Sequence, residues 1–210
     1  MELDSKITFI VGENGSGKST LLEAIADKCG FNLEGGSRDH RYGTGGKASR
    51  TDLADALRLS WMPKVTSGFF LRAESFFNFA TYIDEVDEGG YAAYGGSSLH
   101  RQSHGESFLA LFMNRFQKGL FILDEPEAAL SPQRQLAFLA ILNELEKAGT
   151  SQFIIASHSP MLIAYPGATV FSLDSGSFQK VDYGQTEQFR LMKHFLESPE
   201  RYFHQLFGSP

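Results

Sequence analysis

The sequence predicts an α/β fold in which a mostly parallel β-sheet is flanked by helices. Continuous apolar runs, typical of strands buried on both faces, lie at residues 7–11, 120–123 and 153–156. Each run is followed by a turn and then by a segment with helical character. Strands that alternate with helices in this way are typical of parallel sheets.

The first half of the chain is expected to contain two strands and two helices. A helix over residues 18–28 follows the first strand, and Gly30 lies where that helix should end. Residues 35–49 are rich in Gly and Ser without periodicity, which is typical of a loop. Residues 51–59 are expected to form a short helix, and residues 68–72 the second strand.

The second half carries clearer helix boundaries. Residues 107–118 are expected to form a helix. Ser131 and Pro132 then predict the N-cap and first turn of a helix that ends before Gly149. The remaining expected elements are a short helix opening at Ser159–Pro160, a strand over residues 170–173 and a last helix opening at Ser198–Pro199.

Length and composition indicate one globular domain over residues 1–210. Hydrophobic residues make up 42% of the chain and charged residues 21%, and the 19 Phe predict an aromatic-rich core. The net charge of −6 argues against a broad basic face for nucleic acid. Because the N-terminus lacks a signal-peptide pattern and no apolar run approaches a membrane span, a cytoplasmic protein is expected. Cys29 has no partner for a disulfide within the chain.

A glycine-rich turn joins the first strand to its helix and fits the P-loop pattern G-x-x-x-x-G-K-[ST]. Its glycines allow backbone N–H groups to turn inward around a phosphate, and the helix N-terminus points at the same place. Lys18 is expected to reach the terminal phosphates, and Ser19 to ligate Mg²⁺. An ordinary glycine turn is the alternative, but it leaves Lys18 unexplained. The expected ATP-binding residues are Gly12, Asn14, Gly15, Ser16, Gly17, Lys18, Ser19 and Thr20.

Two acidic residues, Asp124 and Glu125, directly follow the apolar run at residues 120–123. Ligands of parallel sheets collect at such strand ends. Asp124 is expected to hold Mg²⁺ opposite Ser19, and Glu125 to orient or deprotonate the attacking water. A solvated acidic turn is the alternative interpretation.

Three features besides the P-loop resemble the ABC class of ATPases. The run Ser103-His104-Gly105-Glu106 precedes a helix and resembles the signature L-S-G-G-Q, with Ser103 and Gly105 matching. Glu125 follows the strand-end Asp124, and His158 follows the strand at residues 153–156. The order of the motifs also agrees, whereas the N-K-x-D motif that GTPases use to read the base does not occur. The resemblance covers residues 7–173.

More narrowly, the run Glu-Pro-Glu-Ala-Ala-Leu-Ser-Pro at residues 125–132 is similar to that of small stand-alone bacterial ATPases and of the RecF and overcoming-lysogenization-defect type. The signature Gln is replaced by Glu106, its first Gly by His104, and the usual D-loop Asp by Ser131. No glutamine follows the strand at residues 68–72 in the manner of a Q-loop, and Glu74 is the nearest candidate metal contact. A salt bridge between Glu74 and Arg72 is the alternative reading.

The resemblance implies Mg²⁺-dependent ATP hydrolysis by a homodimer that sandwiches ATP. Glu125 and His158 would be catalytic, with the histidine at the γ-phosphate or, alternatively, capping the next helix. Ser103, His104, Gly105 and Glu106 would face the partner's ATP, although taken alone they read as a helix cap. A helical signature subdomain is expected at roughly residues 75–118.

Two other functions fit the sequence less well. One is an ATP-dependent switch with little hydrolysis, and the other is the ATPase subunit of a membrane transporter. DNA or a protein partner is implied by family analogy alone, and the acidic charge gives DNA no support.

Overall fold

The computed structural model describes residues 2–39, 52–61, 65–86, 104–174 and 176–208. Its centre is a six-stranded sheet in the order β2-β3-β4-β1-β5-β6. All neighbouring strands are parallel except β5 and β6, so the expected mostly parallel sheet is confirmed. The strands are β1 (Ile7–Val11), β2 (Gly68–Arg72), β3 (Gly119–Asp124), β4 (Ser151–Ala156), β5 (Thr169–Ser172) and β6 (Gln179–Val181).

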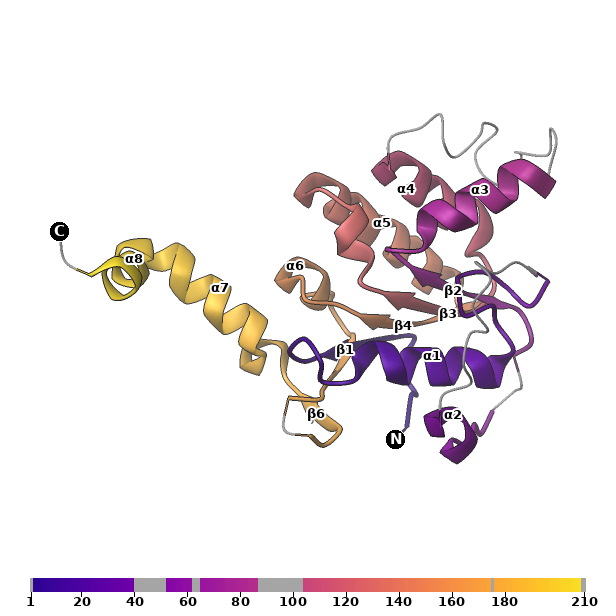
Figure 1. Cartoon of the computed structure of the whole chain (residues 1–210), viewed down its shortest axis with the longest axis horizontal. Coiled ribbons are helices and arrows are strands. Elements are labelled where there is room, and N and C mark those ends of the chain that lie inside the picture. Colours follow the sequence, from indigo (N-terminus) through magenta and orange to yellow (C-terminus); the bar gives the residue numbers. More distant parts are fainter. Residues whose placement is uncertain (1, 40–51, 62–64, 87–103, 175, 209–210) are drawn as a thin grey trace.

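Helices connect the strands and flank the sheet (Figure 1). In chain order they are α1 (Lys18–Cys29), α2 (Asp52–Ala56), α3 (Phe76–Val86), α4 (His104–Arg115), α5 (Pro132–Ala148), α6 (Pro160–Ile163), α7 (Glu187–Glu197) and α8 (Pro199–Phe207). Two 3₁₀ turns, η3 (Pro126–Ala129) and η4 (Tyr183–Gln185), complete the described elements. No helix among these residues is both long enough and apolar enough to cross a membrane.

The sheet is buried on both faces because alternate side chains of its strands feed two apolar clusters. Phe9 and Phe121 belong to the cluster beneath α3, α4, α5 and α6. Their strand neighbours Ile10 and Ile122 belong to the cluster on the opposite face, which α1 covers. Figure 1 shows the same arrangement, with α1 and α2 on one side of the sheet and α3 to α6 on the other.

Phenylalanine rings fill the larger cluster, as the composition predicts. Phe116 stacks on Phe121 with ring centroids 4.4 Å apart, and Phe121 stacks on Phe153 at 5.2 Å. Phe112 meets Phe116 edge-on at 4.3 Å and Phe138 at 4.7 Å. These contacts join α4 and α5 to β3 and β4, and so fix the strands whose ends carry the acidic pair and His158.

One helix start differs from the sequence-based expectation, and one expected cap lacks its side-chain hydrogen bond. The helix expected at residues 107–118 runs from His104 to Arg115, so Ser107 lies buried within its first turn. Ser131 precedes α5 as expected, but its side chain caps no backbone N–H there. Ser159 does cap α6, since its hydroxyl accepts a hydrogen bond from the Leu162 N–H at 3.4 Å.

The carboxyl ends of four strands form one continuous edge, and hydrogen bonds extend the sheet one residue beyond it. The Glu125 N–H donates to the Ala156 carbonyl at 3.0 Å, and the Ser157 N–H to the Ile10 carbonyl at 3.2 Å. Leu173 N–H donates to the Val11 carbonyl at 2.9 Å. The segments that follow β1, β3, β4 and β5 are therefore held at fixed spacing, and the candidate site lies along them.

Candidate functional site

The loop between β1 and α1 has the backbone geometry of an anion cradle. Gly15 and Gly17 have φ values of 83° and 94°, in the left-handed region that favours glycine. A side chain on Gly12 would place its Cβ 2.6 Å from the Ser16 hydroxyl oxygen. The loop therefore needs glycine at these positions, as the pattern predicts. Asn14 and Thr20 are both exposed to solvent.

Lys18 is the first residue of α1 and is only 4% exposed. Its Nζ donates to the carbonyl oxygens of Gly12 at 2.8 Å and Glu13 at 2.9 Å, and thus lies across the loop. Burial lowers the pKa of Lys18, whereas the charges of Glu125 and Asp124 act to raise it. A buried ammonium beside a helix N-terminus is a setting that favours a multiply charged anion.

Ser19 and Asp124 meet although they lie 105 positions apart in the chain. The Ser19 hydroxyl donates to Asp124 Oδ1 at 3.2 Å. Asp124 is 6% exposed, and burial raises its pKa to about 6 against the opposing effects of Ser19 and Arg72. A hydroxyl and a carboxylate are oxygen ligands of the kind that Mg²⁺ prefers.

A small cavity opens beside this pair. It has a volume of about 140 Å³ and is lined by Ser19, Arg72, Ala73, Glu74, Asp124, Glu125 and Ala128. A water molecule occupies roughly 30 Å³ of liquid, so the cavity has room for an ion together with several waters. The donor set and the space therefore both fit Mg²⁺.

Arg72 links the acidic groups around this cavity. It is the register partner of Asp124 on neighbouring strands, and its Nε lies 3.7 Å from Asp124 Oδ2. It also pairs with Glu23 at 2.6 Å and with Glu74. The salt-bridge alternative for Glu74 is thus present in the structure, while the expected metal contact of Glu74 stays a prediction.

Glu125 has a strained backbone. Its φ of 51° makes it the one non-glycine residue with a positive φ in the described parts of the chain. A left-handed conformation disfavours a residue with a Cβ by roughly 1–2 kcal/mol. Such outliers concentrate at functional sites, and here the conformation places the carboxylate beside His158. Glu125 Oε1 lies 3.4 Å from His158 Nε2.

His158 is positioned through its backbone by a residue that the sequence pattern did not single out for a role. Its N–H donates to Glu127 Oε1 at 2.5 Å. Burial raises the pKa of Glu127, and the hydrogen bond from His158 opposes that effect. The η3 turn thereby ties the end of β3 to the end of β4, so that both catalytic candidates are held together.

The signature candidates lie at the start of α4. Ser103 falls outside the described residues, and His104 is the first residue of the helix. Gly105 packs under Arg134 of α5, where an added Cβ would approach Arg134 Cδ to 2.5 Å. Glu106 pairs with Arg134 at 3.4 Å. The expected contact of this region with a partner's nucleotide stays a prediction.

Asp174 is a site neighbour that the sequence reasoning missed. It follows β5, and its Oδ1 accepts a hydrogen bond at 2.7 Å from the N–H of Glu13 in the cradle. The Ser172 hydroxyl donates to its other carboxylate oxygen at 2.8 Å. The signal was available, since an acid soon after an expected strand resembles the pattern at Asp124.

Comparison with known families gives two matches. A model described as an AAA domain matches residues 1–69, which include the cradle. An AAA-domain model whose description includes the AbiEii toxin of type IV toxin–antitoxin systems matches residues 98–164, which include the acidic pair and His158. Comparison with curated proteins gives no match.

The solved structures that match this chain in backbone structure have low sequence identity to it. The SMC head domain from Thermotoga maritima is 18% identical with a TM-score of 0.47, and the match covers 86% of this chain and 91% of that chain. CbiO1 from Clostridium perfringens, part of the ABC transporter complex CbiONQ, is 19% identical with a TM-score of 0.47, covering 96% of this chain and 87% of its own.

The two segments that the family models match contain the parts of the site that meet at the sheet edge. The cradle, the acidic pair and His158 lie on adjacent parts of one sheet edge. Two AAA-domain models thus match separate segments of the chain, and the mostly parallel sheet with the glycine-rich cradle between β1 and α1 is a P-loop NTPase fold.

Proposed function

We propose that the chain binds ATP with Mg²⁺ and hydrolyses it in a head-to-tail homodimer. The observation that carries the proposal is the convergence of two pairs at one sheet edge. Ser19 and Asp124 lie 3.2 Å apart, and Glu125 and His158 lie 3.4 Å apart. One pair offers oxygen ligands for a metal, and the other offers a base beside an imidazole.

Phosphate binding is assigned to the cradle. The backbone N–H groups around Gly15 and Gly17 and the ammonium of Lys18 would surround the β- and γ-phosphates. Ser19 and Asp124 would hold Mg²⁺, with Glu74 a further candidate ligand. When bound, Mg²⁺ supplies positive charge that offsets the charge developing on the phosphate oxygens.

Hydrolysis is assigned to Glu125 and His158. Glu125 would orient a water and accept its proton as the water oxygen bonds to the γ-phosphorus. The bond from that phosphorus to the β–γ bridging oxygen breaks, which yields ADP and inorganic phosphate. His158 would hold the Glu125 carboxylate and contact the γ-phosphate.

Dimer formation would complete the site. In this proposal Ser103, His104, Gly105 and Glu106, at the N-terminus of α4, face the ATP held by the other subunit. The Arg134–Glu106 ion pair supports a fixed orientation of this helix start. The whole chain, residues 1–210, would act as one ATPase domain, with the signature in the subdomain at roughly residues 75–118.

The variant Glu125→Gln tests the proposal. It should retain ATP, form a stable dimer with ATP and Mg²⁺, and release phosphate at least roughly 100-fold more slowly than the wild type. A phosphate-release assay measures turnover, and light scattering with and without ATP and Mg²⁺, at a protein concentration low enough that the nucleotide-free protein is monomeric, measures the ATP-dependent dimer. Glu144→Gln, on the exposed side of α5, is the matched control and should behave as the wild type. Full turnover by Glu125→Gln would contradict the assigned role.

A second candidate is an ATP-dependent switch with slow hydrolysis. The altered signature favours it, because Glu106 stands in place of Gln and already pairs with Arg134. Phosphate release no faster than that of Lys18→Ala would support the switch. A salt-dependent titration with DNA, with and without ATP, tests the partner that family analogy implies.

A further inference from the structure

The last two helices form an extension that we call the C-terminal arm, residues 187–207. Figure 1 shows α7 and α8 projecting from the body. Thr186 is buried and caps α7 by accepting a hydrogen bond from the Phe189 N–H at 3.4 Å. Phe189 packs on Tyr183 with ring centroids 4.6 Å apart. Beyond this attachment, neither helix contains a buried residue.

Large apolar side chains are exposed along the arm. Six of the nine that are exposed among the described residues lie here, although the arm is a small part of the chain. Leu196, Leu206 and Phe207 are exposed by 70%, 71% and 77%. Their spacing is helical, so each helix presents an apolar stripe. The six residues are Leu191, Met192, Leu196, Phe203, Leu206 and Phe207.

Aromatic contacts hold the two helices of the arm in one arrangement. Phe195 of α7 meets Tyr202 at 5.6 Å and Phe203 at 5.9 Å, both edge-on. Phe203 stacks on Phe207 at 5.7 Å. The apolar stripes of α7 and α8 are therefore held in a fixed arrangement and form one surface.

Helices of this length need a packing partner. The helices have 11 and 9 residues, and isolated helices shorter than about 12–15 residues are marginal in water. Helices in proteins are stabilised mainly by packing of the apolar face, which here faces solvent. A surface that covers this face would stabilise the arm.

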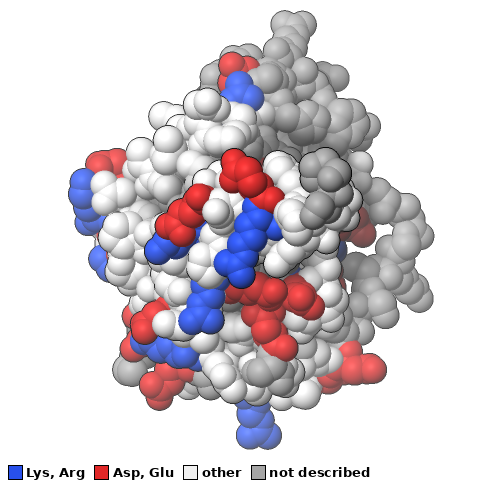
Figure 2. Space-filling model, turned by 90° about the vertical axis from the view of Figure 1, so that its left-hand side faces the viewer, with Lys and Arg blue, Asp and Glu red and all other residues white. Residues whose placement is uncertain are grey.

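The charge of the arm indicates what kind of partner fits. It carries three acidic residues, Glu187, Glu197 and Glu200, and three basic residues, Arg190, Lys193 and Arg201. Figure 2 shows that the side of the molecule seen along the arm mixes acidic and basic groups without a broad basic patch. Anionic lipid and nucleic acid both require a basic surface, so a balanced surface favours a protein.

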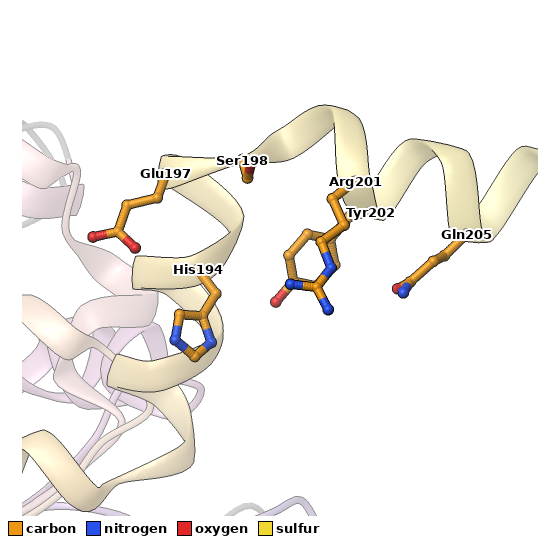
Figure 3. Close-up of a pocket in the computed structure, with 6 residues that line it drawn as sticks. All are labelled: His194, Glu197, Ser198, Arg201, Tyr202 and Gln205. Atoms are coloured by element: carbon orange, nitrogen blue, oxygen red, sulfur yellow. The ribbon is translucent and has the colours of Figure 1, made fainter.

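The bend between α7 and α8 adds a polar rim. A hollow of about 430 Å³ is lined by His194, Glu197, Ser198, Arg201, Tyr202 and Gln205. In Figure 3, Arg201 and Tyr202 project from α8 into the space beside His194, whereas Glu197 lies on the far side of α7. A surface with groups of both signs around an apolar stripe can complement a second copy of itself.

We propose that the C-terminal arm binds the arm of a second copy of this chain, without nucleotide. Taking about 180 Å² for each fully free side chain, near the lower end of the aromatic range, and the exposed fraction of each, the six apolar residues expose roughly 600 Å² per copy. With all of this area covered, two copies would bury about 1,200 Å² of apolar surface, the lower limit of a stable interface, before the polar rim is added.

Pairing of the arms would also affect the rest of the molecule, because of where the arm is attached. α7 contacts α6, the helix that follows His158, so the arm leaves the body near the edge that carries the cradle (Figure 1). Paired arms would hold two such edges close together, at an effective concentration on the order of millimolar. The arm contact itself needs neither ATP nor Mg²⁺.

The oligomeric state of the full chain in EDTA without nucleotide tests the proposal. At about 50 μM, light scattering should give the mass of two chains rather than 23.3 kDa. Leu196→Glu and Leu206→Glu should each weaken the dimer about tenfold or more, because a charge would enter the centre of the interface. Leu136→Glu, at a 57% exposed position on α5, is the matched control and should remain dimeric.

Circular dichroism and the urea unfolding midpoint, measured for each variant, separate a lost interface from a lost fold. A monomeric wild type, or dimerisation unaffected by both arm variants, would overturn the proposal. Equal dissociation of Leu136→Glu would also overturn it, since the effect would then not be specific to the arm. Sedimentation of a monomeric wild type with phosphatidylcholine vesicles would assign the apolar face to membrane instead. Because no nucleotide is present in the mass measurement, these outcomes are independent of the ATPase proposal.

Discussion

Replacing Asp124 with asparagine should change how the stability of the protein depends on pH. Asp124 is almost completely buried at the end of β3, and burial raises its pKa from the ordinary value of 3.8 to about 6. The folded state therefore holds a proton on Asp124 at pH values where the unfolded chain has lost it. Asparagine keeps the shape of the neutral acid and cannot titrate.

The magnitude follows from the two pKa values. At pH 8 the carboxyl is ionised in both states, so its titration adds nothing to the free energy of unfolding. At pH 5 it is mostly protonated when folded and mostly ionised when unfolded, which stabilises the wild type by about 1.4 kcal/mol relative to pH 8. This stabilisation is present at low pH and is lost as the pH rises through 6.

Urea unfolding in EDTA without nucleotide, at pH 8 and pH 5, measures the effect. The free energy of unfolding of Asp124→Asn minus that of the wild type should be about 1.4 kcal/mol larger at pH 8 than at pH 5. Glu127, whose pKa burial also raises, is present in both proteins and cancels. Asp52→Asn, an exposed change on α2, controls for the loss of one charge. An equal or smaller difference at pH 8 would refute the reasoning.

Three further substitutions probe the cradle, the sheet and the strained turn. Lys18→Ala should weaken ATP binding by roughly 100-fold, because charged hydrogen bonds to phosphate are lost, and calorimetry measures this. Gly68→Ala should lower the free energy of unfolding by about 2–3 kcal/mol, because its Cβ would lie 2.0 Å from the Leu120 carbonyl oxygen, whereas Gly184→Ala meets nothing closer than 4.0 Å and serves as control. Glu125→Gly should raise the free energy of unfolding by about 1 kcal/mol while abolishing phosphate release, and a destabilised variant would argue against strain at this residue.

The sequence predicted the parts of the fold whose signals are local. The apolar runs gave β1, β3 and β4, although β3 and β4 begin one and two residues earlier than expected. The glycine pattern with Lys18 gave the cradle and the start of α1. Because parallel strands end at one edge, the same reasoning brought Asp124 and His158 together before any distance was known.

Features that depend on contacts between distant segments were not predicted. Periodicity did not reveal α7, whose residues are all at least partly exposed, or the three-residue β6. The Arg134–Glu106 pair joins two helices, and the Asp174 contact joins the ends of the chain's first and fifth strands. The position of Asp174 after an expected strand was a signal in the sequence, but neither its contact with Glu13 nor the Arg134–Glu106 pair follows from residue spacing.

Because hydrogen bonds hold these segments at the sheet edge, the geometry of the site does not depend on the lengths of the connections between the strands. Glu125, Ser157 and Leu173 are each tied to the last carbonyl groups of a neighbouring strand. The polypeptide leaves this edge after one motif and returns to it only through another strand, so insertions between the motifs can grow or shrink without displacing them. Relatives of this chain should therefore be recognised by the order of their motifs at strand ends, since the number of residues between motifs is free to drift.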